Sequence, residues 1–366
     1  MGSIERDLAP NLPTWVGELY LEAHRGTLTS IAQIKRGNRR AEVAMRDAEI
    51  LLTRAALDGQ LPYPHEAMLG LWKELLTHQF HDILPGSSIA EVNDEAIEAF
   101  GRIISEARAL SSQALGRIIG PATDDRWLLV NTLGWERSSE ICWNGAPDGL
   151  YPVDPSLAAQ WVEDPAGAKR LVIYGAKLPA MGGTVVAMGA VQPQGTSPFE
   201  VSSDAVETPF ARARFDAEGR IVSLIDRSTG REIVRPGAAF NTFVLGEDVP
   251  AEWDNWNVDR DQRLKMRPDS HLVSREVVAN GPLQLRVRCT YRVGQASTVV
   301  QDVVFHSNSP QIDFETVVDW AEKRTLMKTL FPLNVWAETA RHEIQYGHAE
   351  RPTHTNLIQD RARFEV

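Results

Sequence analysis

The sequence has little cysteine, with only Cys142 and Cys289 among its 366 residues. Neither belongs to a Cys-x-x-Cys pair, so the chain has no pattern for a zinc ribbon or a disulfide framework. Such sparse cysteine usage is typical of proteins from a reducing compartment. We therefore expect the protein to be cytoplasmic.

Long apolar runs and a surplus of basic residues are also lacking. No uninterrupted apolar stretch reaches the roughly 18 residues that a membrane span requires, so no membrane partner is expected. The opening sequence MGSIERDLAP has neither a basic start nor an apolar centre, unlike a secretory signal peptide. The formal net charge of -11 argues against a nucleic-acid partner, because nucleic-acid-binding proteins carry a basic face.

The chain does contain two different hydrophobic periodicities, and its length suggests two domains or slightly more. From about residue 38 to residue 119 apolar residues recur at helical spacing, whereas from about Trp127 onward they alternate. The Gly120–Asp125 segment is the natural boundary between the two patterns. This order predicts an α+β multidomain fold, with a three-helix bundle followed by antiparallel β-sandwich structure.

Three helices are expected in the first region, over residues 39–57, over residues 65–81, and from Ser88 past Ala114. Ser88 and Glu91 form a capping-box signature at the start of the third helix. The apolar stripe expected on the second helix consists of Leu69, Trp72, Leu76 and Phe80.

The second region predicts strands joined by tight turns. Asp216–Gly219 should form a hairpin turn, and Thr229–Gly230 a second turn. Residues 192–203 are rich in Pro, Gly and Ser and should form a loop. The strands are expected over residues 210–215, 220–226, 283–293, 298–306 and 311–320.

A histidine and an aspartate stand side by side in THQFHDILPGSS, at the end of the second predicted helix. In a purely structural interpretation, His81 stabilises the negative end of the helix dipole and Asp82 closes a turn. Helical spacing, however, places His81 away from the apolar stripe and near Glu74 and His78, so its ring should point outward. A lone histidine cannot hold zinc, which needs about three or four protein ligands.

Five blocks of the sequence resemble the glycoside hydrolase family 38 α-mannosidases, in the branch with bacterial and cytosolic enzymes. The blocks occur in the same order as in that family and extend from Gly17 toward the C-terminus. They are GELYLEAHRGTLTSIAQIKRGNRRAE, WKELLTHQFHDILPGSSIAEV, FDAEGRIVSLIDRSTGRE, DFETVVDWAEKRTLMKTLFPLNV and EIQYGHAERPTH.

The resemblance implies a retaining, zinc-dependent hydrolysis of terminal α-linked mannose from oligosaccharides, with two catalytic carboxyls roughly 5 Å apart. At the matching positions, His81 would be one zinc ligand and Asp82 would contact hydroxyls of the mannose. It also implies a galactose mutarotase-like super-sandwich for the β region. The family's nucleophile and its other zinc ligands, including a His-x-Asp pair, lie on an N-terminal catalytic domain.

No His-x-Asp pattern occurs in this sequence. We therefore expect a fragment without the catalytic domain, inactive by itself, with that domain as its partner. The expected division is an N-terminal segment over residues 1–37, a three-helix middle domain over 38–120, and a β-sandwich region over 121–366, truncated at its end.

Other candidates remain open at this point. His24 and Arg25 lie in a resembling block and could contact sugar or help to dock the catalytic domain. Trp253 and Trp256 could stack on a pyranose or pack in a core. A rival for the whole chain is a non-catalytic carbohydrate-binding or interaction module, and a third interpretation is a structural scaffold.

Overall fold

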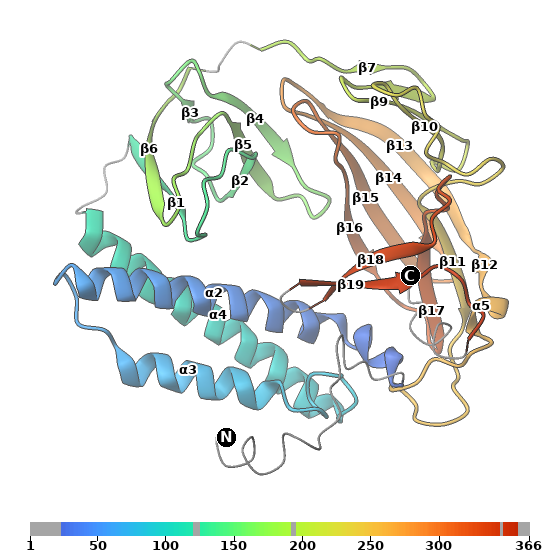
Figure 1. The fold of residues 1–366 in the computed structure, drawn as a ribbon, viewed down its shortest axis with the longest axis horizontal. Helices are drawn as coiled ribbons and strands as arrows, with labels where there is room; N and C mark the ends of the chain where they lie inside the picture. The colour runs from blue at the N-terminus through green and yellow to red at the C-terminus, as the bar shows by residue number, and fades with distance from the viewer. Residues whose placement is uncertain (1–22, 120–124, 192–194, 345–346, 358–366) are drawn as a thin grey trace, which may run out of the picture.

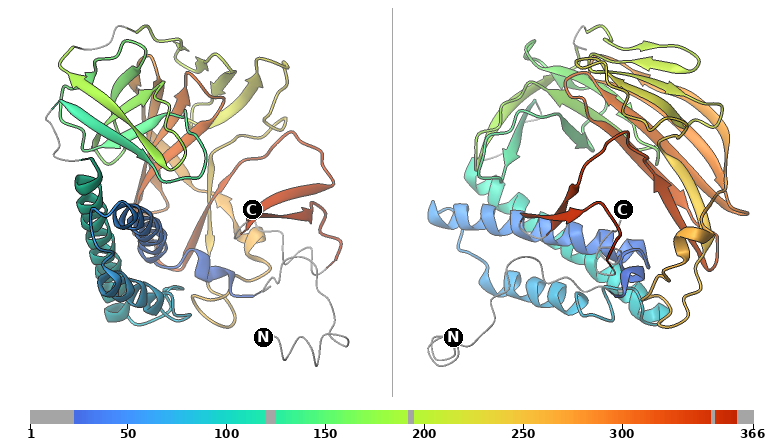
Figure 2. Two further views of the ribbon diagram at one scale, coloured as in Figure 1. Left: turned by 60° about the vertical axis from the view of Figure 1, so that its left-hand side comes forward. Right: turned by 45° about the vertical axis from the view of Figure 1, so that its right-hand side comes forward.

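The computed structural model describes residues 23–119, 125–191, 195–344 and 347–357. A layer of helices lies along one side of the molecule and the sheets arch over it, so the two sequence periodicities become two regions (Figures 1 and 2). Most of the predicted boundary at residues 120–125 and the two chain ends lie outside the described residues. No helix in the described ranges is long and apolar enough to cross a membrane.

The three predicted helices are present and share one apolar core. Met45 and Leu52 from the first helix, Leu75 from the second and Phe100 from the third are buried in this core. Gly37 allows close packing there, because an added Cβ would lie 2.9 Å from the Cβ of Phe100. The helical elements are η2 (Arg25–Leu28), α2 (Ala32–Leu57), α3 (His65–His78) and α4 (Ala90–Ile119).

The apolar stripe predicted for α3 is correct at Trp72, which packs against the core, and wrong at Leu76 and Phe80. Met68, Leu71 and Leu75 face the core, whereas Leu76 is 59% exposed and Phe80, beyond the end of α3, is 53% exposed. A shift of one residue turns a helical stripe by about 100°. This short helix has two overlapping apolar stripes. Packing against α2 and α4 decides which of the two is buried.

The β region begins with a small sandwich of two three-stranded antiparallel sheets, with strand orders β1-β6-β3 and β2-β5-β4. Leu171 and Ile173 of β5 are fully buried between the sheets, together with Val186 of β6. The strands are β1 (Arg126–Asn131), β2 (Ile141–Asn144), β3 (Tyr151–Pro152), β4 (Ala158–Glu163), β5 (Lys169–Tyr174) and β6 (Gly182–Gly189).

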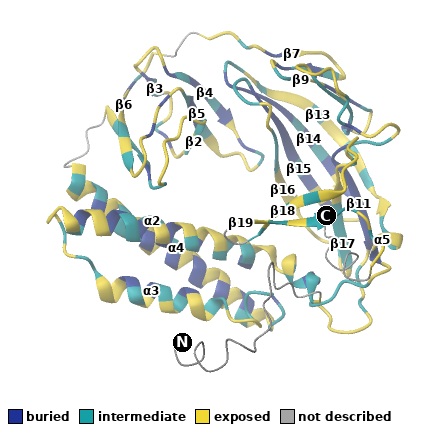
Figure 3. Cartoon of the chain, in the orientation of Figure 1, coloured by how far each residue is buried: buried dark blue, intermediate teal, exposed yellow. Residues whose placement is uncertain are grey.

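A larger set of antiparallel sheets follows, with strand orders β10-β9-β8-β7, β12-β11-β17, β13-β14-β15-β16 and β18-β19. We call the sheet β13-β14-β15-β16, which has the longest strands, the largest sheet. Its buried positions run along its two central strands, β14 and β15 (Figure 3). The short helix is α5 (Gln262–Lys265), and the strands are β7 (Glu200–Val201), β8 (Ala205–Glu207), β9 (Ala211–Phe215), β10 (Ile221–Asp226), β11 (Thr242–Glu247), β12 (Arg267–Pro268), β13 (Ser270–Asn280), β14 (Gln284–Val293), β15 (Ser297–His306), β16 (Ile312–Asp319), β17 (Thr325–Leu330), β18 (Thr339–Ile344) and β19 (Gly347–Pro352).

The fold class of a helical region followed by antiparallel sheets is thus confirmed, as are the five predicted strands, which correspond to β9, β10, β14, β15 and β16. The hairpin turn is confirmed too, since Asp216 N donates to Arg220 O at 2.9 Å and Gly219 has a φ of 72°. Gly230 has a φ of 70° in the second predicted turn.

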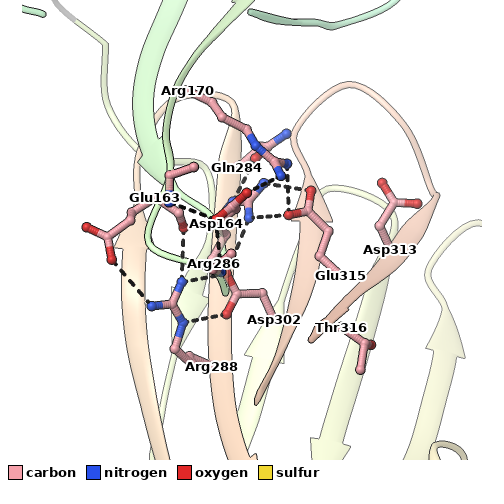
Figure 4. Close-up of polar contacts among 12 residues, drawn as sticks. Glu163, Asp164, Arg170, Gln284, Arg286, Arg288, Asp302, Asp313, Glu315 and Thr316 are labelled. Atoms are coloured by element: carbon pink, nitrogen blue, oxygen red, sulfur yellow. Dashed lines mark hydrogen bonds and ion pairs between the residues drawn. The ribbon is translucent and has the colours of Figure 1, made fainter. Parts of the chain in front are cut away.

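A buried network of charges joins the small sandwich to the largest sheet (Figure 4). The side chain of Arg286 on β14 is fully buried, and its guanidinium contacts Asp302 at 3.3 Å and Glu315 at 3.0 Å. Arg170 of the small sandwich reaches the same Glu315 at 3.0 Å. Arg288 donates to the other oxygen of Asp302 at 2.7 Å. We call these five residues the charge clasp.

Candidate functional site

The predicted second helix ends earlier than expected, so His81 lies in a loop beyond it. α3 ends at His78, and residues 79–86 form consecutive turns. Ile83 N and Leu84 N both donate to Phe80 O, at 2.9 and 3.0 Å, and Gly86 N donates to Ile83 O at 2.9 Å. Pro85 disfavours helical geometry at the residue before it, and the positive φ of Gly86, 77°, turns the chain. We call residues 79–86 the His-Asp loop.

The His81 and Asp82 side chains both project from this loop into solvent. The His81 side chain is 71% exposed and that of Asp82 is 54% exposed, with 3.6 Å between Nε2 of His81 and Oδ2 of Asp82. The ring of Phe80 lies 4.2 Å from the His81 ring. His81 therefore points away from the helical core, as its spacing predicted. An exposed imidazole beside a carboxylate can give one nitrogen to a metal or a proton to a ligand.

Of the neighbours that helical spacing offered to His81, Glu74 is paired with another residue and His78 packs against α4. Glu74 forms an ion pair with Arg102 of α4. The His78 ring lies 5.7 Å from that of Phe100, and burial lowers the pKa of His78. Across the described ranges, no group of three or more His, Cys, Asp or Glu is placed to hold a metal ion. The loop thus fits a metal through one histidine, and the remaining ligands would have to come from other residues.

Ser88 supports the loop in a way that the sequence did not predict. α4 begins at Ala90, and the Ser88 hydroxyl donates to the backbone carbonyl of Asp82 at 2.6 Å. The hydroxyl is thereby used to hold the backbone at Asp82 instead of capping the helix at the position predicted from the capping box.

His24 and Trp256, left open by the sequence, pack against each other. The two rings meet edge to face with centroids 5.0 Å apart, and His24 Nδ1 lies 3.1 Å from Oδ1 of Asn257. Gly26 N donates to Trp256 O at 2.9 Å, so η2, which contains Arg25, is attached to this part of the β region.

Trp253 has a different environment from Trp256. It is 65% exposed and has a φ of 60°, which is rare for a bulky residue and marks a locally strained turn. Trp253 also meets the His24 ring edge to face, with centroids 6.3 Å apart. Packing therefore accounts for Trp256 and His24, whereas most of the Trp253 side chain stays exposed.

Comparison with solved structures defines the class of fold. The structures of a family 38 glycosyl hydrolase and of an alpha-mannosidase, both from Enterococcus faecalis, superpose with TM-scores of 0.67 and 0.71, at 14% and 15% sequence identity. Each alignment covers 96% of this chain, and 50% and 49% of the respective structures. The helices and sheets described above therefore have the same fold as about half of each of these two structures.

The sequence comparisons identify the family. Residues 22–118 match the "Alpha mannosidase middle domain" and residues 206–366 match the "Glycosyl hydrolases family 38 C-terminal domain". The whole chain is 36% identical to alpha-mannosidase 2C1 of Homo sapiens and 33% identical to that of Mus musculus, and 97% of it aligns with alpha-mannosidase G of Dictyostelium discoideum at 30% identity. The chain belongs to glycosyl hydrolase family 38 and contains its middle and C-terminal domains. It spans 34%, 34% and 36% of these three relatives.

Proposed function

We propose that the chain is part of a retaining, zinc-dependent α-mannosidase that hydrolyses terminal α-linked mannose from oligosaccharides. The observation that supports this most strongly is the exposed His81–Asp82 pair on a turn of the α-mannosidase middle domain. Zinc, when bound, would supply Lewis-acid contacts to hydroxyls of the sugar.

The two residues would have separate tasks in this scheme. His81 would give a ring nitrogen lone pair to the metal, which requires a neutral imidazole. Asp82 would accept hydrogen bonds from mannose hydroxyls, and its charge would strengthen them. The nucleophile and the acid/base carboxyl would be supplied by a catalytic domain, and this chain alone should be inactive.

The surface around the pair fits a domain that covers it. Leu76 and Ile89, which flank the His-Asp loop in sequence, are 59% and 67% exposed, and Phe80 within the loop is 53% exposed. Large apolar side chains that are exposed close together in the chain commonly mark interaction sites. We propose that the catalytic domain docks here and completes the metal site, and that the assembled enzyme is cytoplasmic.

The proposal is tested by combining this chain with an α-mannosidase catalytic domain and measuring zinc content and turnover of an aryl α-mannoside. We expect His81→Ala to weaken zinc binding at least about 100-fold, because a direct ligand matters more than its supporting partners. Asp82→Asn should lower kcat/KM by about 10–100-fold, the loss of a charged hydrogen bond. His65→Ala, an exposed histidine at the start of α3, is the matched control.

Unchanged zinc content and turnover in His81→Ala would exclude this residue as a ligand. The alternative of a non-catalytic carbohydrate-binding module is favoured by the exposed Trp253. It predicts saturable mannose binding to this chain without zinc, lost in Trp253→Ala and retained in Trp135→Ala, a tryptophan of matching 64% exposure.

A further inference from the structure

One face of α2 contacts both ends of the His-Asp loop. Lys35, Asn38 and Glu42 are spaced at i, i+3 and i+7, so their side chains leave the helix on the same side. All three are half-buried, although they are polar. Their partners explain this burial, because each of them contacts the loop or a residue that does.

At the start of the loop, Gln79 is held by two of these side chains. Its Nε2 donates to Oδ1 of Asn38 and to Oε1 of Glu42, both at 2.9 Å. Asn38 and Glu42 also contact each other at 3.4 Å. The first residue after α3 is therefore attached to α2 by a small hydrogen-bonded network.

At the end of the loop, Lys35 makes the corresponding contact. Its Nζ donates to the backbone carbonyl of Pro85 at 2.7 Å and to that of Ser30. Burial lowers the pKa of Lys35 to about 8, so the ammonium group has given up part of its hydration to reach these carbonyls. Gly86 then lies directly on Ser30, since an added Cβ would be 2.8 Å from Ser30 O.

We propose that Lys35, Asn38 and Glu42 are positioning residues that clamp the His-Asp loop at Gln79 and Pro85, and so fix His81 and Asp82 for metal and sugar. His81 and Asp82 are both largely exposed, so core packing does not hold their side chains. The backbone that carries them is held instead from its two ends and by Ser88 in the middle. The role in metal and sugar binding rests on the proposed function, whereas the clamp itself does not.

The clamp is tested by amide hydrogen exchange on this chain. In Lys35→Met, which keeps the apolar stem, we expect the amides of Ile83, Leu84 and Gly86 to exchange about tenfold faster, the effect of losing one charged, partly exposed hydrogen bond. Amides in the middle of α2 and α4 should keep their rates. Arg54→Met removes an ion pair near the other end of α2 and should leave the loop amides unchanged. Equal exchange rates in Lys35→Met and wild type, or a uniform increase along the bundle, would overturn the clamp.

The positioning role is tested on the chain combined with a catalytic domain. Lys35→Met should weaken zinc binding and lower kcat about tenfold under conditions in which both proteins are fully folded, with partial rescue in Lys35→Arg. Normal zinc affinity and kcat in a Lys35→Met protein with faster loop exchange would overturn the positioning role. If the wild-type combination binds no zinc, the proposed function fails and the positioning role fails with it, whereas the exchange experiment still decides the clamp.

Discussion

At the scale of the residue, two histidines have different roles because their surroundings differ. The His81 side chain is 71% exposed, whereas that of His306 is 10% exposed. His306 Nδ1 lies 2.9 Å from Oε2 of Glu140 and Nε2 lies 2.9 Å from Oδ2 of Asp313. The exposed ring of His81 can bind a metal or a ligand. His306 instead bridges Glu140, the residue before β2, and Asp313 of β16. Residue type alone could not separate the two.

The pH dependence of stability should reveal the His306 bridge. Burial by itself would lower the pKa of His306, but the hydrogen bonds and charges of Glu140 and Asp313 outweigh it and raise the pKa. The stabilisation is therefore complete below the unfolded-state pKa of about 6.5 and is lost as pH rises through the folded-state value. Gln284 and Gln311 donate to the same two carboxylates, but their amides stay neutral at every pH and add nothing to the pH dependence.

We expect His306→Gln to flatten the decline in unfolding free energy above about pH 6.5, measured by urea unfolding at several pH values. His271→Gln, an exposed histidine on β13, should keep the wild-type slope. A His306→Gln profile parallel to that of wild type would contradict the bridge.

At the scale of the element, the position of helix ends decides what the site can do. The predicted α3 reached His81, but the observed helix ends at His78 and leaves the His-Asp pair on turns. Pro85 and Gly86 were visible signals of termination, whereas the contacts of Gln79 with α2 were not. The exact end depends on those long-range contacts, and hydrophobic periodicity carries no information about them.

Gly86 offers a test of how tightly the loop lies against the segment before α2. It has a φ of 77°, and an added Cβ would lie 2.8 Å from Ser30 O and 2.9 Å from Cγ1 of Ile31. We expect Gly86→Ala to lower the unfolding free energy by about 2–3 kcal/mol, from a left-handed backbone plus a steric clash.

Gly59→Ala is the matched control, because Gly59 has a similar φ of 66° and nothing within 4 Å of the added Cβ. Gly59→Ala should lower the unfolding free energy by about 1 kcal/mol, because only the left-handed backbone opposes the new side chain. Thermal or urea unfolding of both variants measures the difference, and equal losses would show that the loop moves away from Ser30 without cost.

At the scale of the whole molecule, the charge clasp connects parts that are distant in sequence. Arg170 comes from the small sandwich, whereas Arg286, Asp302 and Glu315 come from three neighbouring strands of the largest sheet (Figure 4). Buried charges are tolerated only when they are paired and hydrogen-bonded. The pair of Arg170 with Glu315 links the two β units, whereas the fully buried Arg286 and Asp302 are paired within the largest sheet itself.

Arg286→Met should lower the unfolding free energy by about 3–5 kcal/mol, since the fully buried Asp302 and the partly buried Glu315 each lose a cationic partner. The exposed pair of Arg212 with Glu207, at 2.8 Å, provides the comparison. Arg212→Met should lower the unfolding free energy by less than about 1 kcal/mol. Urea unfolding of the two variants gives both values, and similar losses would show that the clasp adds little to stability.

The sequence by itself determined the order of helical and β regions, the five predicted strands and the turns between them. Each of these follows from spacing along the chain, through periods of 3.6 and 2 residues or through turn residues such as Gly219 and Gly230. The resemblance of five ordered blocks to family 38 was equally a property of the sequence, and the comparisons confirmed it.

Only the tertiary structure decided which stripe of α3 is buried, where α3 ends and what holds the His-Asp loop. The choice of Met68 over Leu69 for the core depends on the side chains that α2 and α4 present. The contact of Lys35 with Pro85 and that of Arg170 with Glu315 join residues 50 and 145 positions apart. Such pairs are brought together by packing and depend on the whole fold, so local sequence patterns could not reveal them.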